Sequence, residues 1–176
     1  MSNLDQAELR QCFDAVRSGD RNAFAALYQE LKIPVYSVIR RIVRTQPAAE
    51  DAMQEVFLKL LAEPPAPSVQ NLRAWVFRMA RNQALDALKK KQHAELTEDV
   101  PSGLPPMEQD IATRLDLEDA LGRLDVAERE LLVLHLTAGL TFREVAEITG
   151  SSLPSVYRQY RKALGRLRDF LNGGIQ

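Results

Sequence analysis

The sequence predicts an all-α protein, and three observations support this fold class. Apolar residues recur every three or four positions through nearly the whole chain, which is the period of an amphipathic helix. No segment shows the alternation that is typical of strands. Proline and glycine residues that interrupt helices stand between the periodic segments. Helices are expected near residues 4–17, 21–31, 34–44, 48–62, 71–91, 111–123, 126–138, 141–149 and 153–171.

Length and composition indicate a globular protein. The 176-residue chain is 45% apolar and 27% charged, which suits one ordinary domain or two small ones. No apolar run has the length of a membrane span, and the N-terminus lacks a signal-peptide pattern. The single cysteine, Cys12, allows no internal disulfide. We therefore expect a cytoplasmic protein without membrane insertion.

Charge is unevenly spread along the chain. Residues 71–93 hold six basic side chains and one acidic one, and residues 131–176 hold six and three. Residues 94–130 between them hold three basic and eleven acidic side chains. Two basic segments that flank an acidic one could bind a polyanion such as nucleic acid. On charge alone, solvated helix faces explain the pattern equally well.

An acidic, proline-containing segment at residues 93–110 has little to bury and is interpreted as a flexible linker. It separates an N-terminal domain, residues 1–92, from a C-terminal domain, residues 111–176. Each is near the lower size limit for independent folding. The predicted architecture is two small helical domains joined by a flexible linker.

The expected helix at 48–62 has two different stripes. One is apolar and is predicted to be buried, and the opposite one is polar apart from Leu58. An apolar side chain within a polar face favours a protein partner over solvent, although one exposed leucine is weak support. The buried stripe comprises Ala49, Met53, Val56, Phe57 and Leu60, and the opposite stripe Asp51, Gln54, Glu55 and Leu58.

The expected helix at 71–91 combines basic and aromatic residues. Arg78, Arg81, Asn82 and Lys89 mark one face, with Trp75 at its edge. Rings and cations along one surface can bind single-stranded nucleic acid by stacking on bases and contacting phosphates. A core position for Trp75 is an equal alternative. Burial is the preferred interpretation for the neighbouring aromatic residue, Phe77.

The C-terminal helices at 141–149 and 153–171 carry the signals of a helix-turn-helix. Thr141 and Glu144 form a capping box, and Gly150 can adopt the left-handed conformation that ends a helix. Ser152 is a suitable N-cap for the next helix, and Pro154 fits its first turn. A short helix, a tight turn and a second helix are the geometry of DNA-binding helix-turn-helix units.

The second of these helices has a basic outer face. Arg158 and Arg161 could reach guanine edges or phosphates in the major groove. An α-helical hairpin with a solvated face is the alternative. The inner face comprises Val156, Tyr160, Ala163, Leu164 and Leu167, and the outer face Ser155, Arg158, Arg161 and Lys162, with Tyr157 at the border.

No pattern indicates an enzyme. The sequence has no nucleophile paired with a base, no glycine-rich phosphate loop and no cluster with metal-ligand spacing. The two histidines, His93 and His135, are isolated from each other. We expect no catalytic residue, no metal site and no cofactor.

Together and in this order, residues 18–31, 50–60, 72–91 and the helix-turn-helix closely resemble the bacterial sigma-70 family. The match is to its compact extracytoplasmic-function type. It covers roughly residues 10–92 and 111–171. The resemblance implies a promoter-specificity subunit of RNA polymerase, with a region 2-like domain followed by a region 4-like domain.

The resemblance also implies partners and site residues. The segment 50–60 would dock on the clamp helices of the polymerase β′ subunit, and the β flap is a further expected contact. The linker would pass through the polymerase, where its acidic residues could mimic nucleic acid. The implied sites are Asp51, Gln54, Glu55 and Leu58 for polymerase; Asn71, Trp75, Arg78, Arg81, Asn82 and Lys89 for recognising and melting the −10 element; and Ser155, Tyr157, Arg158, Arg161 and Lys162 for the −35 element.

The sequence departs from the family pattern in two places. The loop at 63–70 is proline-rich and short of polar groups, so the base-selecting role of this loop in the family is not assigned here. Ser155 and Tyr157 replace the Thr and the small or basic residue that are usual, which predicts an unusual DNA preference. No sensor domain is expected after Gln176, and a separate anti-sigma factor is a candidate regulator.

Two other functions fit parts of the sequence. A stand-alone helix-turn-helix regulator would bind duplex DNA as a symmetric dimer on paired half-sites. It would leave the stripe around Leu58 and the surface at Trp75 without a role. A helical adaptor that makes only protein contacts would tolerate alanine at Arg158 and Arg161.

Overall fold

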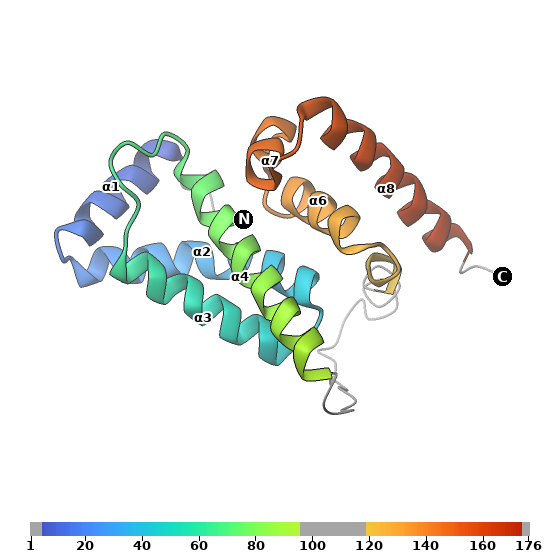
Figure 1. Cartoon of the computed structure of the whole chain (residues 1–176). Coiled ribbons are helices and arrows are strands. Elements are labelled where there is room, and N and C mark those ends of the chain that lie inside the picture. The colour runs from blue at the N-terminus through green and yellow to red at the C-terminus, as the bar shows by residue number, and fades with distance from the viewer. Residues whose placement is uncertain (1–4, 96–118, 174–176) are drawn as a thin grey trace. The chain divides into compact units, whose positions relative to one another are not determined.

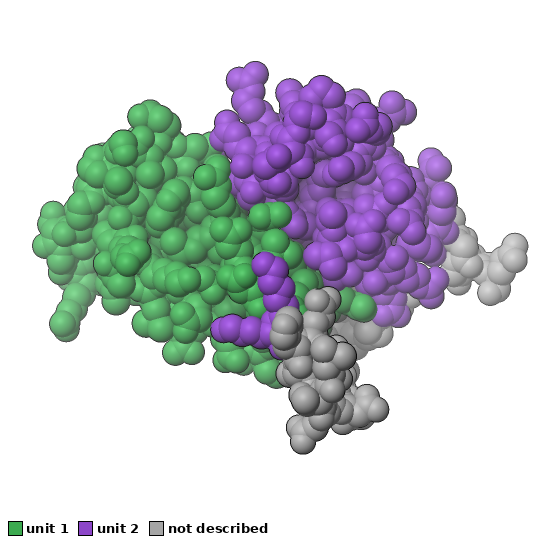
Figure 2. Space-filling model, viewed as in Figure 1, with its two compact units in different colours: residues 1–88 green, residues 89–176 purple. Residues whose placement is uncertain are grey.

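The computed structural model describes residues 5–95 and 119–173 of the chain. Every regular element within those two ranges is a helix, so the predicted all-α class is confirmed. The chain divides into two compact units, residues 1–88 and 89–176, which Figure 2 shows in different colours. No helix in the described ranges is both long and apolar enough to cross a membrane.

The N-terminal unit contains α1, α2, α3 and most of α4 (Figure 1). The long helix α2 packs against α1 on one side and α3 on another. The last helix, α4, continues three residues beyond the predicted domain end, and the rest of the predicted linker lies outside the described residues. The bounds are α1, Gln6–Arg17; α2, Arg21–Val43; α3, Gln46–Ala62; and α4, Leu72–Glu95.

Short polar side chains define where α1 and α2 begin. The Asp5 carboxylate accepts hydrogen bonds from the backbone N–H groups of Ala7 and Glu8, each at 2.8 Å. The Glu8 carboxylate accepts from the Asp5 N–H in return, which completes a capping box. Asp20 caps α2 in the same position, directly after Gly19, whose φ of 88° turns the chain between the helices.

The sequence predicts two helices, at 21–31 and 34–44, with a break before Pro34. This break is wrong, because α2 runs as one helix through Pro34. Proline removes one backbone hydrogen bond and crowds the preceding turn, which usually ends or kinks a helix. Here Leu27 and Leu31 before the proline, and Val35 and Ile42 after it, are buried. Their burial outweighs one lost hydrogen bond, since each large buried side chain contributes about 1.5–3 kcal/mol.

The core of the N-terminal unit is built from all four helices. Phe77 of α4 is fully buried, which confirms its predicted core position, and Phe13 of α1 is buried as well. The predicted stripe of α3 is largely confirmed, but Met53 is half-buried and Ala52 is buried instead. Met53 lines an open hollow between α2 and α3, which leaves it partly exposed.

The C-terminal unit contains α6, Val126–Leu136; α7, Phe142–Thr149; and α8, Leu153–Gly173. The preceding residues 119–122 are helical, and the earlier part of the helix predicted at 111–123 lies outside the described residues. The capping box at the start of α7 is confirmed, and so is the left-handed Gly150 at φ 68°. The shared core comprises Ala120, Leu121, Leu124, Leu132, Ala163 and Leu167, with Tyr160 and Phe170 packed against it.

Candidate protein-docking and nucleic-acid interfaces

The predicted polymerase-binding residues form one exposed stripe on α3. Asp51, Gln54, Glu55 and Leu58 are all exposed, at the i, i+3, i+4 and i+7 positions that share a helix face. The Leu58 side chain is 52% exposed, while its neighbour Phe57 is buried. These four residues are called the docking stripe below. It presents two carboxylates and an amide around an apolar side chain.

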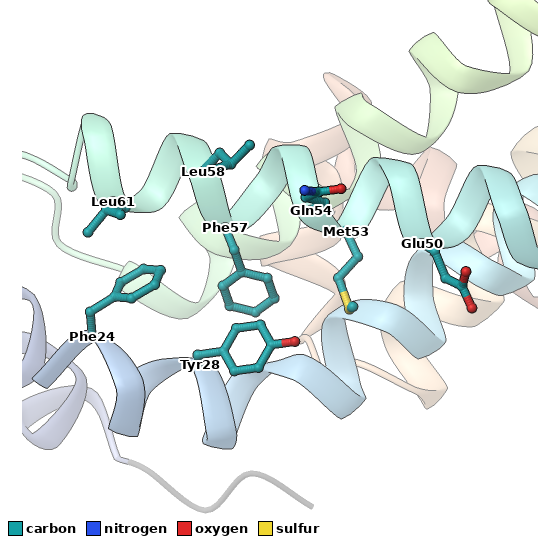
Figure 3. A pocket seen from close by; sticks show the side chains of 8 residues that line it. All are labelled: Phe24, Tyr28, Glu50, Met53, Gln54, Phe57, Leu58 and Leu61. Carbon is teal, nitrogen blue, oxygen red and sulfur yellow. The ribbon is translucent and has the colours of Figure 1, made fainter. Parts of the chain in front are cut away.

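An apolar hollow lies beside the docking stripe, between α2 and α3 (Figure 3). Its volume is about 400 Å³. The rings of Tyr28 and Phe57 meet within it at 4.6 Å between centroids, while Leu58 points away from Tyr28. Leu61, 49% exposed, adds a second open apolar side chain. The lining residues are Phe24, Tyr28, Glu50, Met53, Gln54, Phe57, Leu58 and Leu61.

Such a surface fits a protein partner better than solvent. Two leucines that stay about half exposed next to an apolar hollow form a continuous patch, and patches of this kind mark interaction sites. Acidic and amide groups along one edge would orient a basic or polar partner helix. Leu58 would then be the central apolar anchor of the contact.

The predicted −10 residues lie along α4 and its first turn. Asn71, Trp75, Arg78 and Asn82 recur at steps of three or four residues, and Lys89 follows two turns further on the same side. Arg78, Asn82 and Lys89 are exposed, whereas the other members of the set are half-buried. The helix therefore presents a basic, amide-containing and aromatic strip.

The first turn of α4 fixes two of these residues. The Asn71 side-chain oxygen accepts a hydrogen bond from the Ala74 N–H at 2.9 Å, so Asn71 caps the helix. The Trp75 ring packs edge-on against Phe13 of α1, with 6.5 Å between centroids and 81° between planes. One side of the indole is thereby packed while the residue remains only half-buried. A ring held in this way can offer its open part to a stacking base.

The predicted −35 residues lie at the start of α8, the second helix of the helix-turn-helix. Tyr157, Arg158, Arg161 and Lys162 are exposed, and Ser155 is half-buried. Leu164, predicted on the inner face, is instead 40% exposed, so that part of the prediction is wrong. Leu164 directly follows the buried Ala163 in the sequence and lies at the edge of the packed face of α8.

The outer face of α8 also contains Gln159, which the prediction did not include. Its side chain is exposed and donates a hydrogen bond to the Ser155 hydroxyl at 3.3 Å. Spacing could have identified it, because Gln159 lies four residues after Ser155 and three before Lys162 on the outer face. A glutamine amide can pair with the edge of adenine in the major groove.

An aromatic cluster ties this helix to α6 and α7. The His135 ring stacks on Phe142 at 4.2 Å and meets Tyr160 edge-on at 5.0 Å. Phe142 also contacts Tyr157 and Tyr160, at 5.6 Å and 4.9 Å. The Nδ1 atom of His135 lies 2.7 Å from the Leu140 carbonyl oxygen, an acceptor to which a protonated Nδ1 donates. The cluster fixes the orientation of α8 relative to the turn.

A buried carboxylate provides a second link to α8. Glu128 of α6 is only 5% exposed and lies 2.7 Å from Arg166 and 3.3 Å from Lys162. Burial alone would raise the pKa of Glu128, but hydrogen bonds from Arg166 and Lys162 hold that pKa below its usual value. Lys162 therefore has a protein partner in addition to any role on DNA.

The described ranges contain no group of three or more His, Cys, Asp or Glu side chains that could hold a metal ion. The candidate sites are exposed helix faces. The N-terminal unit carries the docking stripe and most of the strip on α4, and the C-terminal unit carries the helix-turn-helix.

A helical bundle followed by a helix-turn-helix is an architecture of transcription proteins that recognise DNA. The sequence-family model of sigma-70 region 2 matches residues 27–94, and the sequence-family model of sigma-70 region 4 matches residues 114–167. The ECF RNA polymerase sigma factor RpoE of Cereibacter sphaeroides is 30% identical over 162 residues, which cover 87% of this chain and 88% of the relative. The chain therefore belongs to the extracytoplasmic-function sigma factors of the sigma-70 family.

Two further proteins are similar to this chain. The ECF RNA polymerase sigma factor SigK of Mycolicibacterium vanbaalenii is 28% identical over 180 residues, covering 96% of this chain and 91% of the relative. The solved structure of the sigma factor RpoE from Bartonella quintana, in complex with the anti-sigma factor NepR, matches with a TM-score of 0.69. At 22% identity over 84% of this chain and 97% of that one, it shows a shared fold.

Proposed function

We propose that this chain binds core RNA polymerase through the docking stripe and directs it to specific promoters. The observation that carries the proposal is the exposed Leu58, placed among acidic and amide side chains on the helix matched to region 2. The partner surface would be the β′ clamp helices, with the β flap as a further contact for the C-terminal unit. Burial of Leu58 supplies the apolar contribution, and Asp51, Gln54 and Glu55 supply orientation.

Both units would contact promoter DNA. The strip on α4 would recognise and open the −10 element, because cations can hold phosphates while an open ring stacks on an unpaired base. The outer face of α8 would read the −35 element in the major groove. The proposed contacts are Asn71, Trp75, Arg78, Arg81, Asn82 and Lys89 for the −10 element, and Ser155, Tyr157, Arg158, Gln159, Arg161 and Lys162 for the −35 element.

The chain would act through its binding energy and would catalyse no covalent step itself. Phosphate contacts position each unit, and base contacts give specificity. Capture of unpaired bases would offset the roughly few kcal/mol lost when each base leaves the stack. A subunit of this kind acts in the cytoplasm on the transcription machinery. The anti-sigma partner of the Bartonella quintana factor suggests a regulator of the same kind for this chain.

Binding to core polymerase on a native gel tests the proposal. The Asp51→Ala/Leu58→Glu variant removes a carboxylate and the apolar anchor from the docking stripe. A matched control is Glu30→Ala/Ile33→Glu, which makes the same types of change at exposed positions of α2, where Ile33 is 68% exposed. Wild type and control should form a complex, and the stripe variant should not. Equal binding by all three proteins would exclude this docking face.

A further inference from the structure

One face of α1 contacts the segment that leads into α4. Gln6, Arg10, Phe13 and Arg17 follow one another at steps of four, three and four residues, so they share a side of the helix. All four side chains contact residues between 65 and 75. These residues are called the α1 face. Figure 1 shows the connection from α3 to α4 running alongside α1.

Arg10 makes the most specific of these contacts. Its Nη1 donates to the Pro67 carbonyl oxygen at 2.9 Å, and its Nη2 donates to the Val69 carbonyl oxygen at 2.6 Å. A planar guanidinium can hold two acceptors at a fixed separation, which a single ammonium group cannot do. Arg10 therefore fixes the loop at two points with one side chain.

Two neighbours extend the same contact to both ends of the loop. Arg17 donates from Nη2 to the Pro65 carbonyl oxygen at 2.6 Å, and its Nη1 lies 2.8 Å from the Asp14 carboxylate. Gln6 donates to the Gln70 carbonyl oxygen. The α1 face thus meets the carbonyl oxygens of residues 65, 67, 69 and 70.

The loop is also ordered by its own sequence. The Val69 N–H donates to the Ala66 carbonyl oxygen at 3.0 Å, with Pro67 in the second position of this turn. Proline is favoured there because its φ is already set. At the end of the loop, Asn71 caps α4, and Phe13 of the α1 face packs on Trp75 one turn later. The α1 face thus contacts both the loop at residues 65–70 and the ring of Trp75.

We propose that the α1 face holds the loop and Trp75 ready for binding unpaired promoter bases, and that Arg10 and Arg17 are positioning residues for this step. The inference rests on the proposed function of α4 in opening DNA. Residues that are fixed before binding do not have to be ordered during it, so the entropic cost of binding falls. The proline-rich loop would then act as a rigid wall beside Trp75, despite its few polar side chains.

The substitution Arg10→Lys separates the effect of holding the loop from the effect of positive charge. Lysine keeps the charge but loses the planar two-point contact with the Pro67 and Val69 carbonyls. Trp75 is the only tryptophan of the chain, so its fluorescence reports this surface directly. Acrylamide quenching of Trp75 in the free protein should rise about twofold in Arg10→Lys. The control Arg21→Lys, at an exposed arginine at the start of α2, should leave quenching unchanged.

Binding of unpaired bases is measured with the complete holoenzyme and a pool of single-stranded oligonucleotides that contain a randomised segment. Wild type and Arg21→Lys should enrich a common motif. Arg10→Lys should still bind core polymerase on a native gel, but bind the motif about tenfold more weakly, with a reduced preference at one or more positions. Arg17→Lys, which loses one carbonyl contact, should show a smaller reduction.

The outcomes separate the two proposals. If wild type enriches a motif that Arg10→Lys retains with equal affinity and equal preference, the positioning role is wrong and the promoter function stands. If Arg10→Ala loses binding but Arg10→Lys does not, Arg10 acts through its charge and the inference is again wrong. If the wild-type protein binds core polymerase but the resulting holoenzyme enriches no motif, strand recognition by α4 fails, and the inference fails with it.

Discussion

The two units hold their proposed DNA-binding helices by different physical means. In the N-terminal unit, the start of α4 is fixed by side chains of α1 that donate to backbone carbonyls and by one edge-on ring contact. In the C-terminal unit, α8 is fixed by a cluster of aromatic rings and by the buried carboxylate of Glu128. The first arrangement orders a loop, whereas the second orients a helix that is already regular.

This difference predicts different sensitivities. Hydrogen bonds to carbonyls constrain where a loop lies but add little apolar burial, so their loss should affect binding more than stability. In the C-terminal unit, removal of one partner from a buried ionic contact leaves the other partner uncompensated, which should lower stability. Trp75 lies in the N-terminal unit alone, so its emission follows that unit, while circular dichroism follows the whole chain.

The largest stability effect is expected for Arg129→Ala. Arg129 is 7% exposed and donates to the carbonyl oxygens of Leu121 and Leu124 at 2.9 and 3.0 Å. Its loss would leave these buried acceptors without their charged donor, at a cost of about 3 kcal/mol. Urea unfolding followed by circular dichroism should show an earlier transition, with the Trp75 midpoint unchanged. An equal shift of both signals would contradict separate stabilisation of the two units.

Phe142→Ala should have the next largest effect. This ring contacts His135, Tyr157 and Tyr160, and its removal leaves a gap between α7 and α8. We expect a loss of about 2 kcal/mol, less than for a fully buried phenylalanine, because the residue is half-buried. Binding to duplex promoter DNA should weaken as well, because the start of α8 loses its support. Unchanged duplex affinity would show that the aromatic cluster does not orient the helix.

Acid should destabilise the C-terminal unit through Glu128. Burial opposes ionisation of this carboxyl, but Arg166 and Lys162 lower its pKa below the unfolded value. A lowered pKa contributes stability that is present above the unfolded value of about 4.3 and is lost as pH falls through the folded value. Glu128→Gln should cost about 1–2 kcal/mol near pH 7 and should flatten this acid dependence. If the stability of the C-terminal unit falls with acid in the same way in Glu128→Gln and in wild type, other titratable groups cause the acid dependence.

The smallest stability effect is expected for Lys162→Ala. Its side chain is 67% exposed, so its contact with Glu128 should contribute less than about 0.5 kcal/mol. If Lys162 also contacts a phosphate, the salt dependence of duplex binding should fall by about one unit of slope. Titrations at several salt concentrations measure this slope. A large loss of stability with an unchanged slope would make Lys162 a structural residue instead of a DNA contact.

Sequence patterns predicted the features that depend on neighbours along the chain. The capping box at Thr141 and Glu144 and the turn at Gly150 involve residues a few positions apart, and the structure contains both. The break predicted at Pro34 failed because local propensity was overruled by tertiary burial along both halves of α2. The outward position of Leu164 was missed for a similar reason, since the width of a buried face depends on what packs against it.

Contacts between distant segments could not be derived from periodicity. The spacing of Gln6, Arg10 and Arg17 shows a polar helix face but not the carbonyl groups that it meets some 48 to 64 positions later. Glu128 and Arg166, 38 positions apart, form an ion pair that no local pattern indicates. These contacts position the proposed binding surfaces. The sequence therefore suggested candidate binding residues, but it could not show which contacts hold them in place.

The most direct test is to sequence the 5′ ends of transcripts made in vitro from genomic DNA by core polymerase with and without this protein. The protein should create new start sites that share an upstream and a downstream sequence block. Arg158→Ala/Arg161→Ala should lose the upstream preference, and Trp75→Ala/Arg78→Ala the downstream one. Absence of new start sites, or loss of the same block in both variants, would contradict promoter recognition by two separate helices.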